Sequence, residues 1–101
     1  MIKQCHTLDE VRAEIDRTDD EIVRLIAERG RYVSQAASFK KDTAGVKAPA
    51  RVEAVIAKAK AKAALLGADE NVVEAVYRAM IDAFVKAEMN EFERKQVGSH
   101  G

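Results

Sequence analysis

The feature that most constrains the fold is a seven-residue repeat of apolar side chains from residue 8 to residue 39. In an α-helix such a repeat places its members on one face, where they form a stripe that needs a cover. This first-helix stripe consists of two adjacent lines, which are Leu8, Ile15, Ile22, Arg29 and Ala36, and Val11, Thr18, Leu25, Tyr32 and Phe39. The repeat predicts one helix from about Thr7 to about Lys41, with Thr7 and Glu10 forming a capping box.

A helix of this length does not fit a compact monomer of 101 residues. At about 1.5 Å per residue it spans about 50 Å, whereas a folded domain of 100 residues has a radius of gyration of about 13 Å. A dimer in which two long helices share their stripes resolves the conflict. We therefore expect a homodimer.

Two further helices follow in the sequence. Residues 42–48 contain a glycine and no periodicity, which predicts a loop. Pro49 suits a first helical position and Gly67 a helix end, so the second helix is predicted over 49–66. Asp69 is the expected cap of a third helix that ends near Lys95. The apolar stripe of that helix is Val73, Tyr77, Met80, Ile81 and Phe84.

The predicted fold is all-α, a three-helix chain that forms a single domain over residues 1–101, with its core in 7–95 and a disordered tail over 96–101. Lys plus Arg and Asp plus Glu number 17 each, which argues against nucleic-acid binding. No apolar run approaches the length of a membrane span. The sole cysteine, Cys5, excludes an intrachain disulfide or cysteine zinc cluster, and the two histidines lack metal-ligand spacing. We expect a cytoplasmic protein without metal or cofactor.

Four charged residues on or beside the apolar stripes are the candidate site residues. Arg29 replaces a leucine in the first-helix stripe, where it pairs with an acid across a dimer or binds an anion. Lys40, about 16 Å further on nearly the same face, can bracket that anion or complement the helix dipole. Glu88 continues the apolar stripe of the third helix. If it faces Arg29 or Lys40, it is a structural ion-pair partner of that cation. Arg12 lies about 25 Å from Arg29, so only an antiparallel partner helix would bring them to one site.

Three segments of the chain together resemble the all-helical chorismate mutases. They are residues 8–16 (LDEVRAEID), residues 25–33 (LIAERGRYV) and the pair Phe39-Lys40. The resemblance covers residues 7 to 95 and implies an intertwined dimer of three-helix chains that needs no cofactor. Because chorismate rearranges to prephenate in one pericyclic step, the absence of a nucleophile or metal motif fits this chemistry.

The resemblance also implies a role for each candidate residue. Arg12 from the partner chain and Arg29 would each bind one substrate carboxylate. Lys40 would contact a carboxylate and the ether oxygen that joins the pyruvyl group to the ring. Glu88 stands where family members carry glutamine or glutamate that hydrogen-bonds the same oxygen. Cations and a hydrogen-bond donor would hold the compact substrate conformer and stabilise charge on that oxygen.

Two departures keep alternative functions open. Pro49 and Ala50 stand where many mutases carry an arginine and a glutamate, although Arg51 follows. The short segment after Lys40 and residues 48–52 (APARV) resemble the isochorismate pyruvate lyase branch, which carries glutamine at the position of Glu88 and makes salicylate. The candidates are a chorismate mutase, such a lyase with side mutase activity, a mutase for an amino-substituted chorismate, and a helical dimerisation module without turnover.

Overall fold

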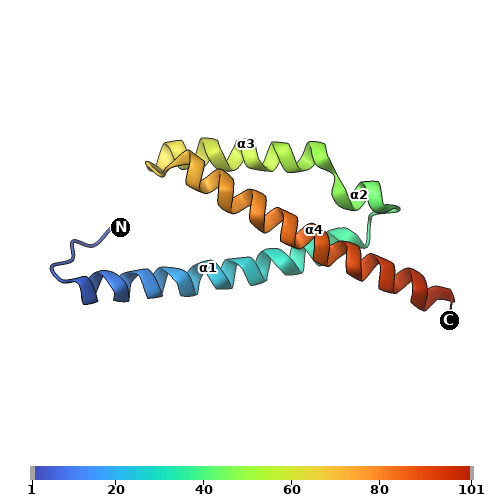
Figure 1. Cartoon of the computed structure of the whole chain (residues 1–101), viewed down its shortest axis with the longest axis horizontal. Coiled ribbons are helices and arrows are strands. Elements are labelled where there is room, and N and C mark those ends of the chain that lie inside the picture. Colours follow the sequence, from blue (N-terminus) through green and yellow to red (C-terminus); the bar gives the residue numbers. More distant parts are fainter. Residues whose placement is uncertain (1, 101) are drawn as a thin grey trace. The chain divides into compact units, whose positions relative to one another are not determined.

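The computed structural model describes residues 2–100, with side chains as far as residue 94, and within them only helices occur. In chain order these are α1 (Leu8–Ala37), α2 (Thr43–Lys47), α3 (Pro49–Leu66) and α4 (Glu70–His100) (Figure 1). The all-α prediction is therefore confirmed. The chain divides into two compact units, Met1–Tyr32 and Val33–Gly101. None of the described helices is long and apolar enough to span a bilayer.

The predicted capping box starts α1. The amide of Glu10 donates to Thr7 Oγ1 at 3.1 Å, and Glu10 Oε2 accepts from the amide of His6 at 2.8 Å. The reciprocal bond thus reaches one residue further back than in the usual motif. Two of the amides at this helix start are satisfied, which fixes where α1 begins.

The end of α1 lies at Ala37, four residues before the predicted end at Lys41. Ser38 Oγ donates to the Gln35 carbonyl at 2.7 Å. The amides of Ser38, Phe39 and Lys40 then donate to carbonyls three residues back, at 3.0 to 3.2 Å. A serine that bonds the preceding turn offers the backbone an alternative to the α-helical ladder. The prediction was wrong here because the apolar repeat carries no information about this local bond.

Over residues 8–32, the first-helix stripe has no cover within its own unit. Its large apolar side chains are exposed by fractions that range from 39% for Val11 to 84% for Phe39. No residue of α1 is buried. An amphipathic helix owes most of its stability to burying its apolar face. The stripe is therefore an apolar surface that would be stabilised by packing against another surface.

The segment predicted as a loop over 42–48 contains the one-turn helix α2, so that prediction was wrong. Asp42 caps it, with its Oδ1 accepting from the amide of Gly45 at 2.8 Å. Val46 is 2% exposed and anchors the turn in the core. Capping and burial of a single apolar residue build this helix, and neither produces a periodic pattern.

Helices α3 and α4 form an antiparallel hairpin, in which they lie side by side (Figure 1). The predicted bounds of α3 are confirmed, and Gly67 ends it with a left-handed φ of 72°. The amide of Ala68 donates to the Ala63 carbonyl at 2.8 Å, which completes the helix end. Asp69 caps α4 as predicted, accepting from the amide of Asn71 at 2.9 Å.

The backbone of α4 continues as a helix to His100, beyond the predicted end near Lys95. Residues 96–100, expected to be a disordered tail, are thus helical, and Gly101 lies outside the described residues. Lysine and glutamine favour a helix, and one interior glycine costs only about 1 kcal/mol. Composition alone was a poor guide to this end.

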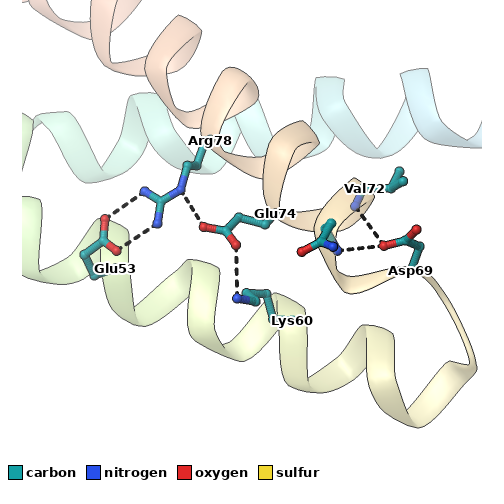
Figure 2. Close-up of polar contacts among 7 residues, drawn as sticks. Glu53, Lys60, Asp69, Val72, Glu74 and Arg78 are labelled. Atoms are coloured by element: carbon teal, nitrogen blue, oxygen red, sulfur yellow. Dashed lines mark hydrogen bonds and ion pairs between the residues drawn. The ribbon is translucent and has the colours of Figure 1, made fainter.

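Four charged residues connect α3 to α4 on the hairpin surface (Figure 2). Arg78 donates to both carboxylate oxygens of Glu53, at 2.9 and 3.0 Å, and through Nε to Glu74 at 2.8 Å. Lys60 Nζ lies 3.0 Å from the second oxygen of Glu74. The hydrogen bond from Arg78 lowers the pKa of Glu53, and hydrogen bonds from Lys60 and then Arg78 lower that of Glu74.

Because these carboxyl pKa values are lowered in the folded state, the network stabilises the fold above the ordinary value of 4.5 and weakens as the pH falls through the lowered values. We expect Arg78→Met to melt a few degrees below wild type at pH 7, and the difference to shrink at pH 3. Lys86→Met removes only a pair with Asp82 within α4 and serves as the control. Thermal melts at both pH values make the comparison, and a difference independent of pH would contradict it.

Candidate functional site

The centre of the candidate site is an ion pair between Lys40 and Glu88. Lys40 Nζ lies 2.7 Å from Glu88 Oε2, and the side chains are 24% and 4% exposed. Glu88 comes from α4, two turns after the buried Ile81. Of the two partners that the sequence allowed for Glu88, the structure shows Lys40. A carboxylate and an ammonium group that are 48 residues apart in the chain thus meet in a part-buried position.

Three elements of the second unit position the Lys40 side chain. The tight turn after α1 carries its backbone. Helix α2 lies against its stem, since a Cβ built on Gly45 would come within 3.5 Å of Lys40 Cβ. The ammonium group then reaches α4, with which α2 also packs. Three elements of the second unit therefore define where the cation sits.

Because the pair is largely buried, its two charges have lost most of their contact with water, unlike those of a surface pair. Desolvating two charges costs several kcal/mol per ion, which their attraction offsets only at good geometry. No described buried side-chain nitrogen or oxygen lacks a hydrogen-bond partner. A cation and a carboxyl group thus lie together where Glu88 is nearly inaccessible to solvent and Lys40 is partly accessible, and each can interact with a polar or anionic ligand.

The predicted site residues Arg12 and Arg29 belong to the first unit, and their place in the site remains a prediction. Arg12 is exposed and Arg29 half-buried. The helix between them is continuous, so they lie about 25 Å apart along α1. One small ligand therefore cannot contact both of them within one chain.

A groove of about 790 Å³ opens between the start of α3 and the middle of α4. Its floor is apolar, with Val52, Ile81 and Val85 among its lining residues. Four of its five charged lining residues pair with each other, Arg78 with Glu53 and Lys86 with Asp82, and the fifth is Lys47. Lys40 and Glu88 are not among its lining residues, so the candidate site rests on the ion pair and not on this groove.

Asp42 is the residue of this region that the sequence reasoning missed. It caps the short helix that lies against Lys40. An aspartate whose side chain bonds an amide three residues later is a common helix start, and this was the available signal. Among the described residues, no three or more histidine, cysteine, aspartate or glutamate side chains are grouped to hold a metal ion.

Residues 11–89 match the sequence family described as chorismate mutase type II. The match covers most of the chain, which therefore belongs to this family. Among curated proteins, the isochorismate pyruvate lyase of Pseudomonas aeruginosa is 32% identical over 97 residues, or 96% of this chain and 95% of that protein. The resemblance drawn from the sequence is thus confirmed at the level of the family, which comprises helical enzymes.

The burial of the pair predicts how its variants affect stability. Lys40→Met leaves Glu88 buried without its ion-pair partner and should lower the free energy of unfolding by about 2–3 kcal/mol. The double variant Lys40→Met/Glu88→Leu removes both charges and should return to within about 1 kcal/mol of wild type. Urea unfolding at one fixed protein concentration measures both. A double variant as unstable as the single one would show that the loss does not come from an unpaired buried carboxyl group.

Proposed function

We propose that this protein is a chorismate mutase, which rearranges chorismate to prephenate at a site built on Lys40 and Glu88. The observation that supports this is the 2.7 Å pair in a mostly buried environment. Family membership supplies the substrate class. An ammonium group beside a carboxyl group can contact both a substrate carboxylate and an ether oxygen.

The rearrangement breaks the ether carbon–oxygen bond and forms a carbon–carbon bond within the same molecule, so no atom enters or leaves. Negative charge grows on the ether oxygen as its bond breaks. Lys40 stabilises this charge. Glu88 accepts from Lys40 in the ion pair, so it must take up a proton before it can donate a hydrogen bond to the same atom. Arg29 binds a substrate carboxylate and helps to hold the compact conformer in which the two reacting carbons meet.

We further propose that the working form is a homodimer that acts in the cytoplasm. The exposed first-helix stripe supports dimerisation, since a second copy offers the same apolar surface along an antiparallel helix. Such an arrangement would bring Arg12 of the partner chain to the second carboxylate. Each dimer would then contain two equal sites.

Isochorismate is the second candidate substrate. The relative from Pseudomonas aeruginosa is an isochorismate pyruvate lyase that matches nearly the whole chain. The short segment between Lys40 and Pro49 also supports this candidate. In this reaction the same ether bond breaks while a ring hydrogen moves to the pyruvyl methylene carbon, giving salicylate and pyruvate. The same cation and carboxyl group would serve the same oxygen.

One assay decides among these functions. Purified protein is incubated with chorismate and, separately, with isochorismate, and prephenate and salicylate are followed. We expect prephenate from chorismate, and Lys40→Ala or Arg29→Ala to lower kcat/KM by roughly a hundredfold or more. Lys58→Ala, on the exposed face of α3, serves as the control cation. No turnover of either substrate would reject both enzymatic functions and favour the dimerisation module.

The shared site predicts complementation between two inactive variants. Arg12→Ala and Arg29→Ala chains are unfolded together and refolded as a mixture. A mixed dimer carries both substitutions in one site and neither in the other, so about a quarter of wild-type activity should return in an equal mixture, given random pairing. If the mixture stays as inactive as its components, Arg12 does not act across the dimer.

A further inference from the structure

We propose that Asp42 is a positioning residue for Lys40, because its cap on α2 holds the ammonium group at Glu88. The effect on turnover rests on the proposed function, whereas the effect on the Lys40–Glu88 pair does not. Asp42 itself is exposed and touches no reacting group in this scheme. Its influence passes through α2.

Lys40 is not fixed by the helix that precedes it. Regular α1 ends at Ala37, and the amide of Lys40 donates only to the Ala37 carbonyl, three residues back, at 3.1 Å. One turn of this kind constrains the backbone less than an α-helical ladder does. The direction of the Lys40 side chain therefore depends on what packs against it.

Helix α2 is the element that packs against the Lys40 stem. A Cβ on Gly45 would lie 3.5 Å from Lys40 Cβ and 3.7 Å from its Cγ. The same Cβ would lie 3.4 Å from Asp42 Oδ1, so the cap, the glycine and the lysine stem form one compact group. Val46, one residue later, anchors this group in the core.

A helix of five residues depends on its ends. It is far shorter than a helix that is stable by itself, so its cap decides whether the turn persists. Asp42 has extended backbone angles and accepts from the Gly45 amide. At the other end Ala48 takes a left-handed φ of 35°, which costs a non-glycine residue energy and needs support from its neighbours.

The kinetic test compares two aspartate caps of the same chain. Asp42→Ala should lower kcat roughly five- to tenfold, the factor that corresponds to losing a typical cap. Asp42→Asn keeps a good cap without the charge and should stay within about twofold of wild type. Asp69→Ala removes the cap of α4 and should lower the melting temperature while leaving kcat unchanged. An equal loss in kcat for Asp69→Ala, or for Asp42→Asn, would overturn the proposal.

A double-variant cycle tests whether Asp42 acts through Lys40. In a Lys40→Ala background, Asp42→Ala should have no further effect on kcat, because the group it positions is gone. A further drop by the same factor would show that Asp42 acts on another part of the site.

A measurement without substrate separates this inference from the proposed function. Lysines are acetylated with a limiting amount of acetic anhydride, and the extent at each is read by mass spectrometry. Lys40 should react slowly in wild type and in Asp69→Ala, and several-fold faster in Asp42→Ala, approaching its exposed neighbour Lys41. Unchanged Lys40 labelling in Asp42→Ala overturns the inference even where turnover is seen. Faster labelling in a protein that turns over neither substrate supports it while the proposed function fails.

Discussion

The scarcity of buried apolar side chains is the constraint on which the rest of this structure depends. Among the side chains that the structure describes, four apolar ones are buried, and all belong to the second unit: Val46, Ile56, Ala63 and Ile81. Helix α1 contributes none over thirty residues. Because apolar burial is the main favourable term in folding, helix α1 needs a cover that its own unit does not supply. Our proposal of a homodimer follows from this need.

In so small a core, a buried glutamate such as Glu88 indicates a role other than stabilising the fold. It occupies a buried place on α4 where an apolar side chain would pack without any desolvation cost. Lys40 offsets that cost in part but contributes a second buried charge. A chain with few buried residues has little stability to spare, so an ionic core position points to a role beyond stability. The proposed role at the ether oxygen accounts for both residues at once.

Local signals predicted most helix boundaries. Thr7 and Asp69 have side chains that cap a helix start, and Gly67 adopts the left-handed backbone that ends a helix. The structure places each as expected. The end of α1 and the whole of α2 were missed, because a serine bond and an aspartate cap decide them against the apolar repeat. The site was predicted as a set of candidates. Which cation Glu88 meets depends on how separate helices pack, and a periodic pattern does not encode that choice.

The short turn between α3 and α4 has a consequence for how the protein assembles. A capped hairpin brings together residues that are close in the chain, and such contacts form quickly because they close only short loops. The hairpin can thus form early, before α1 has found a cover. Joining two chains is a bimolecular step, whose rate rises with protein concentration. In this order, the hairpin would form fast within each chain, while the stable packing of α1 and the appearance of activity would follow the slower encounter of two chains.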